Sequence, residues 1–244
     1  MDKNRNSVEF KLTGRYALFS DPVTRIGGEK FTYQIPTYQA LKGITESIYW
    51  KPTFIWYIDG VRVMKKIQTE SKGIKPLKMN DGKNELSFYT YLRDVEYQIL
   101  AHFEWNEHHK ELDHDRNEHK HHNIAKRSVE KGGRRDIFLG TRECQGYVEP
   151  CKFGEGKSDY DDYGEISFGL QFHGYDYPDE TGKNKLTVRL WEAKMNDGII
   201  KFPMPEECSY KRIVRNMTPK KFIEGQHITF IENDLAVADL IQES

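Results

Sequence analysis

Residues 95–105 alternate between large apolar and mostly polar side chains, and this pattern constrains the fold of the 244-residue chain more than any other. Because successive side chains of a β-strand point to opposite faces, a period of two predicts a long strand with one face in the core. The apolar positions are Val95, Tyr97, Ile99, Ala101, Phe103 and Trp105. A similar alternation over residues 8–13 predicts a second half-buried strand, so the chain is expected to contain a sheet.

Two segments carry apolar residues at helical spacing instead. In the first, Thr37 is a suitable N-cap, and the apolar stripe consists of Leu41, Ile44 and Ile48. That spacing puts Tyr49 about 100° away from the stripe. It is expected there on a polar face with Lys42, Thr45 and Glu46. The second predicted helix covers residues 117–131 and ends at Gly132-Gly133.

Further strands are predicted between and after these helices. Asp59-Gly60 is a two-residue hairpin signal between two β-rich runs. Residues 85–92 are expected to pair with residues 95–105 as a second hairpin, after a loop rich in Lys and Gly over residues 70–84. The predicted strands of this part of the chain are 8–13, 53–59, 61–69, 85–92, 95–105 and 135–148.

The order of these elements is β, α, β, β, an inserted hairpin, α and β, which is typical of a ferredoxin-like sheet, as in RRM domains. We therefore predict an α+β fold whose ferredoxin-like (RRM-like) N-terminal domain covers residues 1–150. Residues 151–244 are expected to form an acidic loop, a small antiparallel sheet and a C-terminal tail. Three strands are predicted there, with a tight turn at Asn196-Asp197-Gly198, over residues 166–175, 185–192 and 199–202.

Composition limits the class of protein further. Charged residues make up 31% of the chain, and no segment approaches the roughly 18 consecutive apolar residues of a membrane span. We therefore expect a cytoplasmic protein without a membrane partner. Cys144, Cys151 and Cys208 are an odd number and form no CxxC pair, so they are expected to be reduced thiols and not a disulfide framework or zinc site.

A net charge of −1 conceals two blocks of opposite sign. Residues 120–142 hold seven basic and two acidic residues, whereas residues 151–180 hold eight acidic and two basic residues. The basic block also contains glycines, which let backbone amides approach phosphates, so it is a candidate RNA-binding segment. Its candidate contacts are Lys126, Arg127, Lys131, Arg134, Arg135 and Arg142. The acidic block is expected to face solvent or a basic partner.

The densest chemical signal is a stretch from His102 to His122 that holds seven of the nine histidines. Imidazole titrates near neutral pH, so these residues are candidate acid–base groups or metal ligands. Lys120 beside His121 supplies a cation and a proton-transfer group, two requirements of metal-free RNA cleavage. Tyr49 is a candidate for orienting the phosphate, although the sequence alone favours a partly buried aromatic residue that closes its helix.

A metal site is the alternative use of the same histidines. The spacing of these histidines, and of the acidic residues among them, matches no specific ligand motif such as HExxH. An exposed loop in which most of the histidines have no role is a third interpretation.

Several separated segments resemble the CRISPR-associated Cas-five family of subtype I-C, which is part of the RAMP superfamily. The resemblance covers about residues 8–219 and is carried by FSDPVTRIGGEKFTYQIPTYQALKGITESIYWKP, DRNEHKH, GGRRDIFLGTRECQGYVEPC, GYDYPDETG and VRLWEAKMNDGIIKFP. It implies a ferredoxin-like domain with a small C-terminal sheet. It also implies that the catalytic tyrosine, lysine and histidine of the family fall on Tyr49, Lys120 and His121.

The resemblance implies an endoribonuclease that cuts CRISPR repeat RNA at the 3′ base of its stem-loop without a metal or other cofactor. The product would keep its 5′ handle in a Cascade complex, so the expected partners are pre-crRNA, crRNA and the other complex subunits. One departure is that His119 and His122 flank the Lys120-His121 pair. Two rivals stay open: a non-catalytic subunit that binds the crRNA 5′ handle, and a metal-dependent nuclease that acts on DNA. Non-specific DNA binding is also possible for the basic block.

Overall fold

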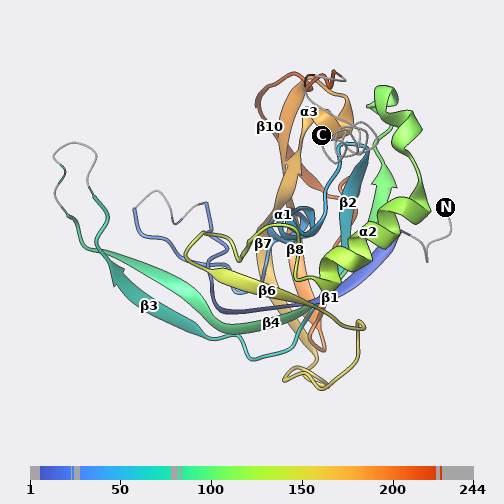
Figure 1. The fold of residues 1–244 in the computed structure, drawn as a ribbon. Coiled ribbons are helices and arrows are strands. Elements are labelled where there is room, and N and C mark those ends of the chain that lie inside the picture. The colour runs from blue at the N-terminus through green and yellow to red at the C-terminus, as the bar shows by residue number, and fades with distance from the viewer. Residues whose placement is uncertain are drawn as a thin grey trace, which may run out of the picture.

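The computed structural model describes residues 6–22, 24, 28–77, 82, 84–223 and 226. In these residues the fold is mixed α/β and is dominated by one antiparallel sheet (Figure 1). The strands are β1 (Ser7–Ala17), β2 (Phe54–Val63), β3 (Thr69–Ile74), β4 (Ser87–Trp105), β5 (Ile137–Phe138), β6 (Gln145–Pro150), β7 (Glu165–Asp176), β8 (Lys185–Asn196), β9 (Ile199–Lys201) and β10 (Tyr210–Asn216). The helices are α1 (Tyr38–Ile48), α2 (Glu118–Glu130) and α3 (Pro178–Thr181), with a 3₁₀ helix at Lys110–Asp115.

The strand order is β10-β8-β9-β2-β4-β1-β6-β5, with β3 added to β4 and β7 added to β8. Helix α1 packs against β2 and β7, and α2 packs against β1 and β6. Figure 1 shows β3 and the adjoining half of β4 extending away from the body of the molecule. No described helix combines the length and apolarity that a membrane crossing requires.

The strongest sequence prediction, the alternating strand, is confirmed as part of β4. Its apolar face is buried, with Ile99 and Phe103 fully covered. The predicted hairpin of residues 85–92 with residues 95–105 is wrong, because both belong to the same strand. Asp94 has a φ of 51°, but pairing with β1 continues on both sides of it, so one left-handed residue does not reverse the chain.

The partner of this first half of β4 is β3, which lies where a loop over residues 70–84 was predicted. Residues 78–81 and 83 of that predicted loop lie outside the described residues. The hairpin predicted at Asp59-Gly60 is also wrong, because β2 runs through both residues with a shift of register between Ile58 and Gly60. Gly60 permits the close approach of β9 instead, since an added Cβ would lie 3.1 Å from the Ile200 carbonyl oxygen.

Both predicted helices are present, and each has a side-chain N-cap: Thr37, as predicted, and Asn117, which was predicted only as the first residue of its helix. Thr37 accepts a hydrogen bond from the amide of Ala40 and Asn117 accepts one from the amide of Lys120, so each side chain satisfies an otherwise unpaired amide. After α2, Gly132 and Gly133 adopt φ values of 80° and 105°, which end the helix in the region that glycine favours.

The later strands match the prediction in part. Residues 135–148 contain two short strands, β5 and β6, in place of one. The three strands predicted after the acidic loop are confirmed, and Asp197 and Gly198 form their turn with φ values of 46° and 79°. The separate small sheet predicted for them is wrong, because β9 pairs with β2 and joins these strands to the main sheet. Strand β10 was not predicted, because its seven residues are all exposed and carry no alternation. Most of the predicted C-terminal tail, residues 224, 225 and 227–244, lies outside the described residues.

The predicted polar face of α1 is buried and anchors the C-terminal strands. Lys42 is 3% exposed and forms an ion pair of 2.5 Å with Glu180, because β7 and α3 cover this side of the helix. Most carboxylates of the acidic block likewise bind groups within the chain. Examples are Asp161 with Arg62 and Glu165 with Lys194. The acidic block is therefore not the free charged surface that its composition suggests.

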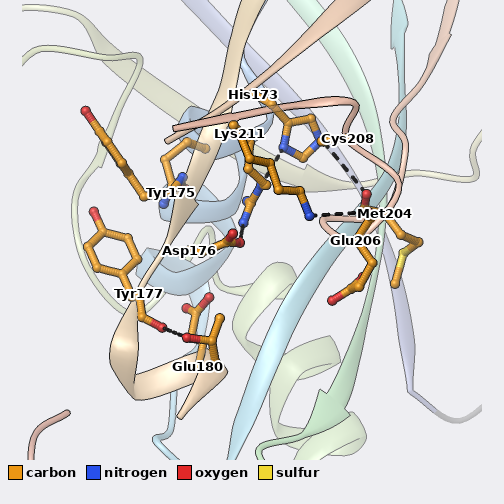
Figure 2. Close-up of polar contacts among 12 residues, drawn as sticks. His173, Tyr175, Asp176, Tyr177, Glu180, Met204, Glu206, Cys208 and Lys211 are labelled. Carbon is orange, nitrogen blue, oxygen red and sulfur yellow. Dashed lines mark hydrogen bonds and ion pairs between the residues drawn. The ribbon is translucent and has the colours of Figure 1, made fainter. Parts of the chain in front are cut away.

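A second group of contacts joins the first turn of α1 to β7 and β8, and Figure 2 labels its β7 residues His173 and Asp176. Its members, called the His173 cluster here, are His173, Arg189, Asp176 and Tyr38. The His173 ring stacks on the Tyr38 ring with centroids 4.1 Å apart. Arg189 donates to His173 Nδ1 and forms an ion pair with Asp176. Tyr38, His173 and Arg189 are buried, and Asp176 is partly buried. The cluster therefore holds the C-terminal strands β7 and β8 against α1.

Candidate active site

The end of α1 determines where Tyr49 points. Tyr49 is the C-cap and has extended backbone angles (φ −156°, ψ 129°), so it does not continue the polar face of the helix as predicted. Its side chain turns inward and is 3% exposed. The indole nitrogen of Trp56 donates a 2.7 Å hydrogen bond to the Tyr49 carbonyl, which fixes this turn of the backbone.

The first turn of α2 positions Lys120 and His121 in opposite surroundings. His121 shares the inner side of the helix with Ala125, and its ring is fully buried among aromatic residues of β2 and β4. Those rings are Phe54, Phe103 and Trp105. The neighbouring Lys120 side chain is 41% exposed. One turn of helix therefore presents an imidazole to the interior and an ammonium group to the surface.

Tyr49 and His121 lie 72 positions apart in the sequence and contact each other directly. The Tyr49 hydroxyl is 2.7 Å from His121 Nδ1, and His121 Nε2 is 2.8 Å from the Asp115 carbonyl oxygen. Because a carbonyl only accepts, Nε2 carries a proton. In the neutral imidazole Nδ1 is then unprotonated, and the Tyr49 hydroxyl donates to it.

Asp115 links the remaining groups. Its carboxylate is 2.7 Å from Lys120 Nζ, 2.7 Å from Thr53 Oγ1 and 3.4 Å from His121 Nε2. Burial acts to raise the pKa of Asp115, but hydrogen bonds from His121, Lys120 and Thr53 outweigh it, so this pKa lies well below its usual value. Asp115 is thus a fixed negative charge that holds both candidate catalytic residues of α2.

The Tyr49 hydroxyl stays protonated near neutral pH. Burial, followed by the negative charge of Asp115, raises the pKa of Tyr49 well above its usual value, while Arg134 acts in the opposite direction. Tyr49 is therefore a hydrogen-bond donor, and a nearby phosphate oxygen or imidazole nitrogen is its natural acceptor.

Four of the six candidate RNA-binding residues gather in one groove of about 970 Å³. They are Lys131, Arg134, Arg135 and Arg142. The amides of Arg134 and Arg135 each donate a 3.2 Å hydrogen bond to α1, at the carbonyls of Ile48 and Ser47 respectively. These bonds attach the groove, named the arginine groove here, to the turn of helix that precedes Tyr49.

The other two candidates lie apart from the arginine groove. Lys126 lines a separate cavity of about 380 Å³ with His122, and Arg127 is an exposed residue of α2 that is not part of the groove lining. The sequence placed all six in one charged block but could not assign them to one face.

The clustered histidines separate in the fold. His102 pairs with Asp59, His109 pairs with Glu111, and His122 donates to the Ser7 carbonyl. Among the described residues, no three His, Cys, Asp or Glu side chains are grouped as metal ligands. Cys144, Cys151 and Cys208 are free thiols.

Sequence reasoning missed the role of Asp115, which it considered only as a metal ligand. Asp115 precedes the N-cap Asn117 by two residues, and the 3₁₀ helix that ends at Asp115 turns its side chain back over α2. The available signal was an acidic residue just before the N-cap of a helix whose first turn carries the Lys120-His121 pair. Its partner Thr53, from the start of β2, could not be located without the fold.

The fold and site define a mixed α/β protein in which a buried tyrosine–histidine pair lies beside a cationic groove. A family model described as CRISPR-associated protein, Cas5d type, matches residues 7–203. The chain belongs to this family, the Cas5 proteins of subtype I-C, as the sequence resemblance predicted.

Two curated relatives carry the name CRISPR pre-crRNA endoribonuclease Cas5d. The one from Mannheimia succiniciproducens is 29% identical over 228 residues, which cover 81% of this chain and 95% of the relative. The one from Thermus thermophilus is 28% identical over 153 residues, 59% of this chain and 63% of the relative.

Two solved structures share the fold over most of their length. A crystal structure of a CRISPR-associated protein is 36% identical with a TM-score of 0.72, and it covers 84% of this chain and 96% of its own. A functionally uncharacterized protein from Streptococcus mutans is 39% identical with a TM-score of 0.71 at the same coverage of both chains.

Proposed function

We propose that this protein is a metal-independent endoribonuclease that cuts CRISPR repeat RNA at the 3′ base of its stem-loop. The names of both curated relatives support pre-crRNA as the substrate. The observation that carries the proposal is the joining of Tyr49, His121, Asp115 and Lys120 next to the arginine groove. Family membership further supports retention of the crRNA 5′ handle within a subtype I-C Cascade complex.

In the proposed reaction the 2′-hydroxyl of the nucleotide before the cut attacks the adjacent phosphorus. A bond forms between the 2′-oxygen and phosphorus, the bond to the 5′-oxygen breaks, and a 2′,3′-cyclic phosphate and a 5′-hydroxyl result. Neutral His121 has an unprotonated Nδ1 and takes up the 2′-hydroxyl proton, which it later returns to the leaving 5′-oxygen. Lys120 stabilises the charge on the phosphorane, and Tyr49 positions the phosphate.

Burial sets a requirement on this mechanism. His121 is fully buried and Tyr49 is 3% exposed, whereas Lys120 reaches the surface from its ion pair with Asp115. In the proposal, the scissile phosphate first binds Lys120 and draws it away from Asp115. The Tyr49–His121 pair must then become accessible to the 2′-hydroxyl, so RNA binding has to move the chain around the start of α2.

A 2′-deoxy substitution at the nucleotide before the cut tests the chemistry. The substituted repeat RNA should bind as the all-ribose RNA does but remain uncut, and the all-ribose RNA should be cut in excess EDTA to a 2′,3′-cyclic phosphate. Cleavage of the 2′-deoxy RNA, or loss of cleavage in EDTA, would overturn the proposal. A DNA hairpin of the same sequence that is cut only with added metal would support the metal-dependent nuclease instead.

Burial also favours a second candidate function, a non-catalytic subunit that binds the crRNA 5′ handle. Both nitrogens of His121 and the Tyr49 hydroxyl are already satisfied by partners within the chain. Under this alternative the pair stabilises the packing of α1 on α2. Replacing Tyr49, Lys120 and His121 together would then leave RNA processing by the assembled complex unchanged.

We also propose that residues 1–150 form a ferredoxin-like unit and residues 151–244 an extension of it. The neighbouring strands β2, β4, β1 and β6, with α1 between β1 and β2 and α2 between β4 and β6, support this assignment. A fragment that ends at residue 150 and melts cooperatively would support the division. A fragment without a transition would contradict it.

A further inference from the structure

Tyr147 is a large aromatic side chain exposed within the arginine groove. It lies on β6, is 60% exposed and lines the groove together with Arg134, Arg135 and Arg142. Among the described residues its side chain has no hydrogen bond, ion pair or aromatic contact. Packing therefore does not account for an aromatic residue here.

The alternation of β6 explains why this ring stays outside the core. Gly146 and Val148 face inward, whereas Gln145, Tyr147 and Glu149 face outward. Gly146 is required by the interior, since an added Cβ would lie 3.0 Å from Leu139 Cγ. Tyr147 has no such constraint. Single exposed aromatic residues are common, but this one stands among four cations of one groove.

Cations and an open aromatic face in one groove match the chemistry of single-stranded nucleic acid. Phosphates bind the cations, and an unpaired base stacks on the ring, which is sequence-tolerant because every base has a π-face. A base within a duplex offers no free face, so the ligand class is an unpaired nucleotide. The backbone bonds from Arg134 and Arg135 to the end of α1 put this site next to the proposed active site.

We propose that Tyr147 is a stacking platform for an unpaired nucleotide of the bound RNA, with Arg134 and Arg135 on the neighbouring phosphates. The inference rests on the proposed function for the identity of the ligand as RNA. It makes Tyr147 a binding residue that holds the strand beside the stem-loop and has no part in proton transfer.

The test measures the Kd of a short single-stranded RNA with the sequence that flanks the repeat stem-loop, over a series of salt concentrations. Tyr147→Ala should weaken binding about 5- to 150-fold, since base–aromatic stacking contributes roughly 1–3 kcal/mol. The slope of log Kd against log salt should not change, because no charge is removed. Tyr147→Phe keeps the ring and should bind as the native chain does.

A charge-reversed control separates the two contributions. Arg134→Glu with Arg135→Glu should weaken binding and reduce the salt slope, whereas Tyr147→Ala should leave the slope intact. A 2-aminopurine in place of the stacked base should lose its quenching in Tyr147→Ala alone. Because the Tyr147 ring is exposed, the melting temperatures of both Tyr147 variants should equal that of the native chain.

Several results would overturn the stacking role. These are unchanged affinity in Tyr147→Ala, an equal loss in Tyr147→Phe, which would assign the hydroxyl, and equal weakening toward a blunt RNA duplex. A loss seen only as failure to join the other Cascade subunits would assign Tyr147 to a protein contact. The binding assay needs no cleavage, so RNA that binds through Tyr147 but is never cut would refute the proposed nuclease and leave the stacking site standing.

Discussion

Two fully buried histidines lie at opposite ends of α1, and their surroundings differ in the sign of the nearest charge. His173 stacks on Tyr38 at the start of the helix, and His121 binds Tyr49 at its end. In the His173 cluster the nearest charged group is the guanidinium of Arg189, whose Nε donates to His173 Nδ1. At His121 the nearest charged group is the carboxylate of Asp115.

This difference decides whether the imidazole is suited to carry a proton. Burial, followed by the charge of Arg189, lowers the pKa of His173 to about 3, so this ring is neutral at any physiological pH. Asp115 instead supplies the negative charge that a protonated His121 requires. Burial alone therefore does not separate a structural histidine from a candidate catalytic one, and the charge beside it does.

The largest expected effect is that of removing the His121 ring. His121→Ala should lower the single-turnover rate of repeat-RNA cleavage by about 10²- to 10⁴-fold, the usual contribution of general acid–base catalysis, with Kd for RNA unchanged. His173→Asn is the matched control and should cut at the native rate per folded molecule. Equal loss in both variants would mean that the two histidines do not differ in function.

The next largest effect concerns Asp115. Asp115→Asn should lower the cleavage rate by about 10- to 10²-fold without weakening RNA binding, because Lys120 and His121 lose the charge that positions them. Single-turnover kinetics and a separate binding titration measure the two quantities. Asp115→Glu should restore part of the rate, and a loss confined to binding would contradict the positioning role.

The same variant has a signature in acid stability. The pKa of Asp115 is lowered by folding, so its contribution to the free energy of unfolding is complete above about pH 4 and is lost as pH falls below it. Asp115→Asn should therefore flatten the fall in melting temperature in that acidic range. An unchanged pH dependence would mean that Asp115 is not held as an ion.

A smaller effect is expected from the stability of the His173 cluster. His173→Asn should cost about 2 kcal/mol near neutral pH, which corresponds to a melting temperature about 4–8 °C lower. Because folding lowers the pKa of His173 to about 3, native stability should fall as pH drops from about 6.5 toward 3, and the variant should lose this dependence. Calorimetry between these pH values provides the measurement.

The smallest effect is expected from Glu46, a residue of α1 that lies between the two ends of the helix. Burial raises the pKa of Glu46 to about 7, although the charge of Lys42 opposes the increase; the charge of Glu180 adds a smaller increase. For an acid with a raised pKa, stability falls as pH rises from about 4.5 to 7. Glu46→Gln should therefore raise the melting temperature at pH 8 by about 1–3 °C and leave it unchanged at pH 4.

Local patterns predicted much of the fold because they depend on neighbouring residues. The apolar alternation of β4, the N-cap Thr37 and the glycines that end α2 appear where expected. Asp59-Gly60 was wrongly predicted as a turn, because the same dipeptide that suits a turn also suits the bulge in the pairing of β2 with β4. The exposed strand β10 carries no pattern, since it has no buried face.

The sequence predicted which residue types form the site, but not how these residues contact one another. Lys120 and His121 were expected as a pair, but a helix puts them on different sides, one exposed and one buried. Their link to Tyr49 and Thr53 spans some 70 positions and depends on how α1, β2 and α2 pack. The charges next to the two rings come from nearby positions, Asp115 before His121 and Arg189 on the strand that follows His173, but only the packed structure shows that these charges contact the rings.

The proposed mechanism is tested most directly by comparing three proteins on the repeat RNA in excess EDTA: the native chain, His121→Ala and His173→Asn. We expect the native chain and His173→Asn to cut the RNA, while His121→Ala binds it with native affinity and leaves it intact. Cleavage by His121→Ala at the native rate would refute the catalytic role of His121, and failure of the native chain to cut in EDTA would refute the metal-independent mechanism.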